Sequence, residues 1–302
     1  MQITFKIPDY WPKLKIGDNV NLISPSFALK LGQLPKIKDF LTDWGLKPQI
    51  FSYSSLNKEA FLAHADDQRL AELENAFNAS DCDFILSTRG GYGSARILDQ
   101  FLANKTKPKF KLLTGFSDIT SLHLAFNNCL GFSSLHSPVL TDIATNRINK
   151  KSIEFFRQII FGEVSELSYD INQLNPELKI EKLPKLLGGN LTLIQTSIGT
   201  KWQINNSSQY CMLIEEIDEE AYKIDRSLNH LKNAGIFNNC RAIFFGDMIE
   251  KADSNNQYHL KRIITEFISD INIPTFEIKN IGHDQNNLAI PLGLEPELKD
   301  LS

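Results

Sequence analysis

The sequence predicts an α/β fold in which a parallel-sheet domain, flavodoxin-like or Rossmann-like, is followed by a smaller α/β domain. Short apolar runs alternate with amphipathic stretches through the first half of the chain, as in a parallel sheet with helices on both faces. The alternation stops near residues 162–185, where a polar stretch reads as a linker between domains. Because 302 residues suffice for two domains, we expect residues 1–165 to form the first and residues 180–302 the second.

The predicted strands of the first domain are short apolar segments that end in polar or glycine-containing turns. They lie at residues 19–24, 48–53, 83–87, 110–116 and 131–135. The predicted helices carry apolar side chains at helical spacing, as Leu70, Leu73 and Phe77 do. They lie at residues 34–44, 66–78, 94–102, 118–127 and 150–161. Sites in parallel sheets form at the carboxyl ends of strands, so the loops that follow the third and fourth strands are the first candidates.

The second domain shows the same alternation in a less regular form. One helix is predicted to open after the sequence Gly188-Gly189-Asn190, and two more are predicted at residues 222–233 and 258–269. The strands are predicted at residues 210–214, 241–246, 275–278 and 288–290.

The segment 114–120, TGFSDIT, is the most informative part of the chain. An apolar run ends here in a Gly-x-Ser-Asp step, and a helical pattern begins. Gly115 leaves room for a sharp turn, and a serine at such a strand-to-helix junction projects its hydroxyl beside the amides of the helix N-terminus. Ser117 is therefore a candidate nucleophile, although a serine before a helix can also be a plain N-cap.

Two later segments supply the partners that a serine nucleophile needs. Glu215 follows the apolar run 212–214, and His283 follows Gly282 in a loop segment near the C-terminus. A serine hydroxyl needs a base to take its proton, and an imidazole is an effective base when a carboxylate fixes its tautomer. Ser117, Glu215 and His283 therefore form a candidate triad in that chain order.

The neighbouring acids and the other histidines have simpler interpretations that compete with a catalytic one. The acidic residues at positions 215–220 can form a solvated strand end, although Glu215 leaves the strand first and would be held rigidly there. His123 shares a helical face with apolar residues, which predicts a packed histidine rather than the base. His136 follows a strand, and the pattern leaves open whether it lines a pocket or caps a turn.

The glycine-rich loop Arg89-Gly90-Gly91-Tyr92-Gly93 follows a predicted strand and precedes a helix. It begins like a dinucleotide-binding loop, but Arg96 replaces the third glycine, and no Gly-Lys-Ser or Gly-Lys-Thr step closes the loop as it would in a P-loop. The sequence therefore argues against a nucleotide site. Successive glycine amides can instead form an anion-binding nest, and a tight turn without a ligand is the alternative.

Composition and charge exclude several classes of protein. The net charge is −4 with no basic block, so we expect no nucleic-acid partner. No run of about 18 apolar residues occurs, and prolines interrupt the N-terminus, so we expect a cytoplasmic protein that no membrane holds. The four cysteines are far apart and the six histidines form no metal motif, which predicts neither a disulfide framework nor a metal site.

Five separated motifs together resemble the LD-carboxypeptidase family of serine peptidases, which includes the microcin-immunity peptidases. The likeness runs from about Asn19 to the C-terminus. The motifs are RGGYG at 89–93, GFSD at 115–118, GGNL at 188–191, IEE at 214–216 with YKIDR at 222–226, and GH at 282–283 followed by PLG at 291–293. One departure is His136-Ser137-Pro138, where the family often has His-Gly-Pro; the added side chain bears on the local loop.

The resemblance implies a Ser-Glu-His triad of Ser117, Glu215 and His283. It also implies a cytoplasmic homodimer that releases the terminal D-alanine from murein tetrapeptide by cutting an L-D bond, without a metal or an organic cofactor. The first domain would supply the nucleophile, and the second would supply Glu215 and His283, so the site would lie in the cleft between them.

In the mechanism that follows, backbone amides near Gly90, Gly91 and Asp118 would hold the oxyanion. Arg89 is a candidate clamp for a substrate carboxylate, and a structural ion pair is the other reading of this residue.

Two other functions stay open. A microcin-immunity-type peptidase would cleave peptidyl- or aminoacyl-nucleotide toxins, but such proteins carry a longer segment between nucleophile and glutamate, with aromatic side chains that stack on the nucleotide. Here Ser117 and Glu215 are 98 positions apart, and Trp202 is the only tryptophan between them. A non-catalytic protein that binds cell-wall peptides is the alternative from another class.

Overall fold

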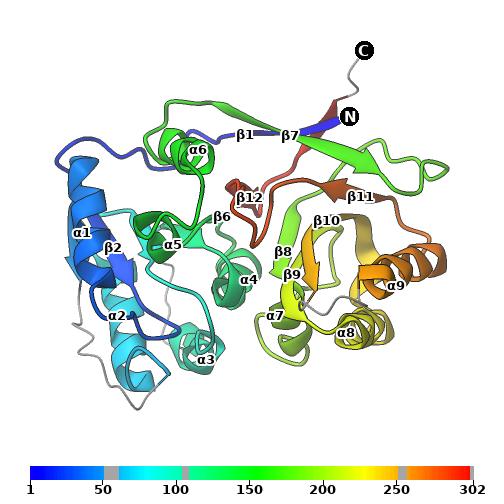
Figure 1. The fold of residues 1–302 in the computed structure, drawn as a ribbon, viewed down its shortest axis with the longest axis horizontal. Helices are drawn as coiled ribbons and strands as arrows, with labels where there is room; N and C mark the ends of the chain where they lie inside the picture. The colour runs from blue at the N-terminus through cyan, green and yellow to red at the C-terminus, as the bar shows by residue number, and fades with distance from the viewer. Residues whose placement is uncertain (51–60, 104–108, 251–256, 300–302) are drawn as a thin grey trace.

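Two sheets side by side form the framework of the protein (Figure 1). The computed structural model describes residues 1–50, 61–103, 109–250 and 257–299. A six-stranded sheet and a seven-stranded sheet each have helices packed against them, and the predicted α/β fold is confirmed. Residues 51–53, part of a predicted strand, lie outside the described residues.

The six-stranded sheet has the order β12-β6-β5-β4-β2-β3. Its strands are β2 (Asn19–Ile23), β3 (Lys47–Ile50), β4 (Phe84–Ser87), β5 (Leu112–Gly115), β6 (Ser134–His136) and β12 (Ile290–Leu292). All pair in parallel except β12, which is antiparallel to β6. Every residue of β4 and β5 is buried, as expected of strands covered on both faces. Their carboxyl ends therefore present loops at one edge of the sheet.

The seven-stranded sheet has the order β13-β1-β7-β11-β10-β9-β8. Its strands are β1 (Gln2–Lys6), β7 (Glu166–Gln173), β8 (Leu186–Asn190), β9 (Tyr210–Glu219), β10 (Cys240–Glu250), β11 (Thr275–Ile278) and β13 (Glu297–Lys299). The strands β8 to β11 are parallel, whereas β7, β1 and β13 continue the sheet in antiparallel pairs.

The helices connect the parallel strands. The first half contains α1 (Gln33–Asp43), α2 (Asp66–Asn78), α3 (Ala95–Ala103), α4 (Thr120–Asn128), α5 (Leu140–Ala144) and α6 (Lys150–Ile160). The second half contains α7 (Leu191–Thr196), α8 (Ala221–Asn233) and α9 (Gln257–Asp270), which lie together on one side of the second sheet in Figure 1. Among the described residues, no helix is long and apolar enough to cross a membrane.

The expectation of a linker over residues 162–185 is wrong for its middle part, because β7 lies there. Buried Leu167, Tyr169 and Ile171 alternate with exposed polar residues along this strand. Such alternation is the pattern of an antiparallel strand with one solvated face, and a count of polar residues alone conceals it.

Each sheet also contains a strand from the other end of the chain. Strand β1, at the N-terminus, pairs with β7 and β13 in the seven-stranded sheet, whereas β12, near the C-terminus, pairs with β6 in the six-stranded sheet. The domain boundaries at 165 and 180 stay a prediction. Because β1 and β12 each pair in the sheet formed mainly by the other half of the chain, the chain passes between the two sheets more than once.

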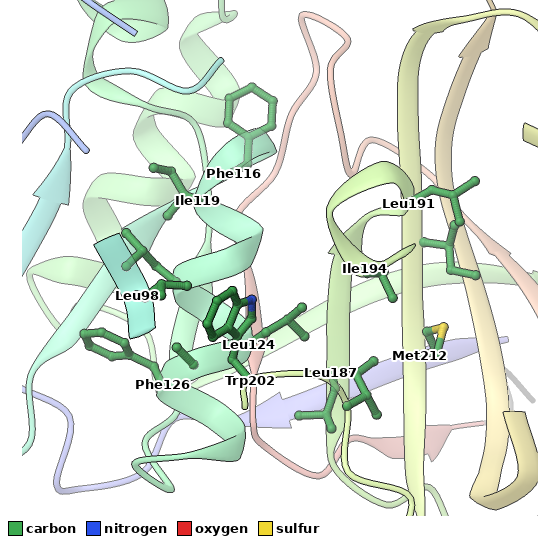
Figure 2. Close-up of a cluster of buried hydrophobic side chains, with 14 of the residues drawn as sticks. Leu98, Phe116, Ile119, Leu124, Phe126, Leu187, Leu191, Ile194, Trp202 and Met212 are labelled. Atoms are coloured by element: carbon green, nitrogen blue, oxygen red, sulfur yellow. The ribbon is translucent and has the colours of Figure 1, made fainter. Parts of the chain in front are cut away.

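An apolar contact holds the two halves together (Figure 2). Leu124 and Trp202 lie between the side chains of the first half, such as Phe126, and those of the second, such as Leu187 and Ile194. All five side chains are buried, and α4 contacts both β8 and α7. The halves therefore share one hydrophobic core at this contact, and burial of this apolar area fixes their relative position.

Candidate active site

Ser117 lies in a strained turn at the carboxyl end of β5. Its φ angle is 63°, a left-handed conformation that costs a non-glycine residue about 1–3 kcal/mol. A single 3-10 turn, Ser117–Ile119, follows and leads directly into α4. This strand, sharp turn and helix have the geometry of a nucleophile elbow, which lifts the serine hydroxyl away from the backbone.

The hydroxyl of Ser117 does not serve as a helix cap. Neither the 3-10 turn nor α4 has a side-chain capping hydrogen bond, so the plain N-cap interpretation fails. Ser117 is partly exposed, whereas its neighbour Asp118 is buried. The hydroxyl is therefore free to face a substrate.

Asp118 ties the turn to two neighbouring loops. Its carboxylate accepts hydrogen bonds from the hydroxyl of Ser26, at 2.5 Å, and from the amide of Ser94, at 2.8 Å. The hydroxyl of Ser94 donates in turn to the carbonyl oxygen of Asp118, at 2.6 Å. Because Ser26 follows β2 and Ser94 follows the glycine-rich loop after β4, three loops are fixed to each other at one edge of the sheet.

The glycine-rich loop approaches the nucleophile closely. A Cβ atom on Gly90 would lie 3.0 Å from the Cβ and 3.1 Å from the Oγ of Ser117, so a larger residue would intrude on the hydroxyl. Gly91 has a φ of 114°, which side chains rarely adopt. Within the described part of the chain, neither amide donates a hydrogen bond to a backbone carbonyl. Both amides are therefore available to an oxyanion or another anion.

Arg89 precedes this loop and is half-buried. Its guanidinium donates to the carbonyl oxygen of Ala28 and lies 5.6 Å from the centre of the Phe27 ring. Burial lowers the pKa of Arg89, while the charge of Asp142 raises it. Arg89 forms no ion pair with any described residue, so the structure gives no support for a structural ion pair here.

Glu215 and His283 form a buried carboxylate–imidazole pair. The Nδ1 atom of His283 lies 2.6 Å from the Oε2 atom of Glu215, and the two side chains are 6% and 0% exposed. Glu215 lies on β9, and His283 lies in the loop between β11 and β12. Gly282 has a φ of 140°, which side chains rarely adopt, and a Cβ atom there would lie 3.3 Å from Oε2 of Glu215, so a glycine suits the position before the histidine.

The pair shifts the pKa of both partners. Burial alone would raise the pKa of Glu215, but the charge of His283 and its hydrogen bond, together with the nearby His136, lower it to about 2. Burial alone would lower the pKa of His283, but Glu215 raises it above 6.5 through charge and hydrogen bonding. Glu215 is therefore ionised at neutral pH, and His283 is a stronger base than a free imidazole.

His283 lies beside the segment of Ser117 but forms no hydrogen bond with the Ser117 hydroxyl. The ring centres of His283 and Phe116, the residue before Ser117, are 4.6 Å apart. Among the described residues, the structure contains the Glu215–His283 hydrogen bond but none between His283 and Ser117. Catalytic hydrogen bonds often form only once substrate is bound, so the candidate triad stays a prediction of which the structure contains one of the two hydrogen bonds.

The interpretation of the acidic segment as a solvated strand end is wrong for its first two members. Glu215 and Glu216 are 0% and 3% exposed. The carboxylate of Glu216 accepts hydrogen bonds from the side chain of Asn190, the amide and hydroxyl of Thr192, and the amide of Ile217. Glu216 thus fixes the start of α7, while Glu215 on the opposite face of β9 meets His283.

The two other histidines of the core differ in their partners. His123 is fully buried and hydrogen-bonded to the hydroxyl of Ser134 and the carbonyl oxygen of Gly115, which confirms that it is a packed histidine. His136 is equally buried, but neither of its ring nitrogens has a hydrogen-bond partner within the described residues. It caps no turn; its Nε2 atom faces Oε1 of Glu215 at 3.9 Å.

Sequence reasoning did not single out Asp247, which lies next to the pair. Its backbone amide donates to the carbonyl oxygen of Ile281, and its Cβ lies 3.0 Å from the position of a Cβ on Gly282. Burial, with the charges of Asp284 and Glu215, raises its pKa to about 6. Asp247 follows an apolar run on the strand beside β9, the same signal that identified Glu215.

A hollow of about 1540 Å³ opens on the other side of Asp247. It runs between β10, β11 and α9, and its lining includes Asp247 and Asp284 but none of the three candidate catalytic residues. We therefore do not assign it to the substrate. No group of three or more His, Cys, Asp or Glu side chains among the described residues could hold a metal ion.

Two family models match the chain in succession. The model described as the LD-carboxypeptidase N-terminal domain matches residues 20–137, and the model of the LD-carboxypeptidase C-terminal domain matches residues 184–298. Together they cover more than half of the chain, including the segments of Ser117, Glu215 and His283.

Named relatives agree with the family models. A Rickettsia conorii protein whose name places it among carboxypeptidases is 34% identical over 89% of this chain and 84% of its own length. The murein tetrapeptide carboxypeptidase of Pseudomonas aeruginosa is 28% identical over 92% of both chains.

Solved structures share the fold. The muramoyltetrapeptide carboxypeptidase of Oxalobacter formigenes superposes with a TM-score of 0.73 at 21% identity, covering 91% of this chain and 92% of that chain. The microcin C7 self-immunity protein MccF, in its wild-type form without ligand, superposes with a TM-score of 0.77 at 19% identity, covering 95% of both chains. At these identities the likeness shows the fold alone.

Proposed function

The chain belongs to the LD-carboxypeptidase family, and from that premise we propose that it is a serine peptidase that releases the terminal D-alanine from murein tetrapeptides. The buried Glu215–His283 hydrogen bond of 2.6 Å next to the strained Ser117 turn is the observation that carries the proposal. A carboxylate that orients an imidazole beside a projecting serine is the arrangement that acyl transfer requires.

The first half of the reaction forms an acyl-enzyme. His283 takes the proton of the Ser117 hydroxyl through its Nε2 atom, while the Glu215 carboxylate accepts the hydrogen bond from Nδ1–H and stabilises the imidazolium. The Oγ atom of Ser117 attacks the carbonyl carbon of the penultimate residue. When the tetrahedral intermediate collapses, the C–N bond breaks, and His283 returns the proton to the departing amine of D-alanine.

The second half reverses these roles with water. His283 removes a proton from a water molecule, the hydroxide attacks the ester carbonyl, and the proton returns to Oγ of Ser117 as the tripeptide leaves. In both halves the oxygen of the intermediate carries a negative charge. The free amides of Gly90 and Gly91, with that of Asp118, are the proposed donors to it, and each such donor is worth about 10²- to 10³-fold in rate.

Arg89 is the proposed clamp for the C-terminal carboxylate of the substrate. It lies directly before the two glycines, its charge has no ion-pair partner among the described residues, and it is half-buried. A partly desolvated guanidinium binds a carboxylate through two parallel hydrogen bonds. That interaction would select a free C-terminus and so favour removal of a single residue.

Cleavage of an aminoacyl-nucleotide toxin is the second candidate, because the fold matches that of MccF as well as that of the peptidase. Trp202 argues against it. The side chain is 7% exposed and packs in the apolar contact between the two halves (Figure 2). The only tryptophan between Ser117 and Glu215 therefore cannot stack on a base.

A homodimer and a cytoplasmic location are part of the proposal and rest on the family resemblance alone. Sedimentation velocity of the purified protein tests the first. Fractionation of cells that express the native chain tests the second.

Mass spectrometry of defined peptides tests the proposed reaction. Tetrapeptides with meso-diaminopimelate or lysine at the third position and D-alanine at the fourth should lose one alanine. A matched peptide ending in L-alanine is the stereochemical control and should stay intact. If the enzyme leaves both tetrapeptides whole but cleaves an aminoacyl sulfamoyl adenosine, the second candidate replaces the first, and cleavage of neither favours a binding protein.

A further inference from the structure

His136 lies on β6 of the six-stranded sheet, and its side chain faces Glu215 on β9 of the other sheet. On β6 it pairs with Gly115 of β5 on one side and with Ile290 of β12 on the other. Strand β5 leads two residues later to Ser117, and β12 begins seven residues after His283. The backbone of His136 is therefore hydrogen-bonded into both strands from which the nucleophile and the base extend.

The side chain of His136 faces the oxygen of Glu215 that His283 does not use. Oε2 of Glu215 accepts from His283 at 2.6 Å, whereas Oε1 lies 3.9 Å from Nε2 of His136. Neither Oε1 nor either nitrogen of His136 has a hydrogen-bond partner among the described residues, and both side chains are 0% exposed. Buried polar atoms without partners are rare and costly, because they lose water without gaining a replacement.

This juxtaposition leads to an inference that rests on the proposed function. We propose that His136 is a positioning residue that donates Nε2–H to Oε1 of Glu215, directly or through one water, and so holds Oε2 against His283 while the imidazolium forms. An N–H at Nε2 is available in one neutral tautomer and in the charged ring alike. The separation of 3.9 Å between Nε2 of His136 and Oε1 of Glu215 is about 1 Å longer than a direct hydrogen bond. A small shift of β6 relative to β9 is therefore enough to form one.

A direct chemical role for His136 does not fit its surroundings. The ring is fully buried, and Glu215 separates it from His283. The centre of its ring lies 5.9 Å from that of Phe116 and 6.3 Å from that of His123. Its neighbours other than Glu215 therefore include an apolar ring and a neutral imidazole. His136 can act on the reaction only through the carboxylate.

Other charged groups face the same pair and set the background for any pH effect. Burial lowers the pKa of His123 to about 3, so this ring stays neutral. Among the described residues, the other charged groups that act on Glu215 or His283, or on their neighbours, include Glu216 on β9, Asp247 on β10, Asp142 on α5, Asp284 in the loop of His283, and Arg147. None of these reaches Oε1 of Glu215 with a hydrogen bond.

Two substitutions separate hydrogen-bond donation from packing. His136→Phe keeps the ring and removes the donor, whereas His136→Gln keeps an N–H at nearly the same reach. Without a donor at Oε1, Glu215 draws the proton of His283 more strongly, so the pKa of His283 should rise further in His136→Phe. We expect the acid limb of the kcat/KM profile to move up by about 0.5 to 1 pH unit. We also expect kcat to fall about 10- to 100-fold with KM unchanged.

His136→Gln should restore most of kcat and return the acid limb towards the wild-type position. His123→Phe is the matched control: it removes another buried histidine from the same contact and should lower the melting temperature without moving the pKa of His283. The pKa of His283 is followed directly by NMR titration of its ring signals, which a His283→Gln variant assigns. This readout needs no substrate, so it tests the role of His136 even if the peptide proves to be the wrong substrate.

Three results would overturn the proposal. The first is a His136→Phe protein with the wild-type pKa of His283. The second is a His136→Gln protein as impaired as His136→Phe, which would mean that packing alone matters. The third is a loss confined to KM, which would place His136 in contact with the substrate.

Discussion

Glu215 and Glu216 offer a sharp test, because they are adjacent, both buried, and differ only in what they contact. Glu215 meets His283, whereas Glu216 fixes the start of α7 through Asn190 and Thr192. Replacing each with glutamine removes one charge and preserves the volume. We expect Glu215→Gln to lose turnover and keep the fold, and Glu216→Gln to lose stability and keep turnover.

The magnitude for Glu215 follows from its pKa. A fall from the ordinary 4.5 to about 2 corresponds to about 3 kcal/mol favouring the ionised carboxylate beside His283. Losing that interaction when the imidazolium forms lowers the rate by about 10²-fold or more. An amide can also hold His283 in the wrong tautomer, which brings the expected loss in kcat to about 10³- to 10⁴-fold.

The magnitude for Glu216 comes from its hydrogen bonds. Glutamine replaces one acceptor oxygen with a donor group, which then faces donors such as Thr192 or Asn190. Each buried donor without a partner costs about 1–3 kcal/mol, so the free energy of unfolding should drop by about 2–4 kcal/mol while kcat stays within about threefold of wild type.

The assay pairs kcat and kcat/KM as functions of pH with urea unfolding of each variant. In Glu215→Gln the acid limb should move to lower pH, because the group that raises the pKa of His283 has gone. If Glu216→Gln lost turnover and Glu215→Gln did not, the assignment of the triad carboxylate would be wrong by one residue. If both lost turnover equally with the fold intact, the contacts seen here would not explain the chemistry.

Three further predictions follow from the same site. Ser117→Ala should fold normally and lose at least about 10³-fold in kcat, and product release at the wild-type rate would remove Ser117 from the mechanism. Gly90→Ala should cut kcat by about 10²-fold with little change in melting temperature, because the methyl group would lie 3.1 Å from Oγ of Ser117. Gly199→Ala is the control: its φ is 84° and nothing lies within 4 Å of the added methyl group, so it should lower the melting temperature and leave kcat unchanged. The Glu215–His283 pair should stabilise the fold most between pH 4.5 and 6.5: the contribution from Glu215 disappears as pH falls towards about 2, and that from His283 disappears as pH rises through its raised pKa. A difference in unfolding free energy between wild type and Glu215→Gln that does not vary with pH would contradict the last prediction.

Local patterns in the sequence were enough to predict most of the parallel strands and their helices. The strands β4 and β5 are unbroken buried runs, and α2 begins with two acids and buries Leu70, Leu73 and Phe77. Strand β7 was missed because its polar alternate residues resemble a linker, and the place of β1 could not be predicted because its pairing with β7 joins residues at least 160 positions apart. Such long-range pairing leaves no trace in local periodicity.

The candidate site divides in the same way. Ser117, Glu215 and His283 stand out in the sequence because each follows a glycine or an apolar run. The expectation that Glu215 leaves its strand first is wrong, because β9 continues to Glu219 and Glu215 lies within it. His136 also follows an apolar run, but the sequence left its role open, because the carboxylate opposite it lies on a strand about 80 positions later. Asp247 follows an apolar run too, and a systematic search for acids after every strand would have found it.

The way the halves are joined bears on how the triad is completed. The candidate site spans both sheets, since Ser117 follows a strand of the first and Glu215 lies in a strand of the second. A wide hinge motion of one sheet relative to the other would have to separate Leu124 and Trp202 from their buried neighbours. Burying apolar side chains of this size contributes roughly 1.5–3 kcal/mol each, so large opening is costly. We therefore expect the contact between Ser117 and His283 to form through local movement of the Ser117 turn or of the His283 side chain, because hydrogen bonds with Asp247, Asn149 and Glu215 hold the loop between β11 and β12 in place.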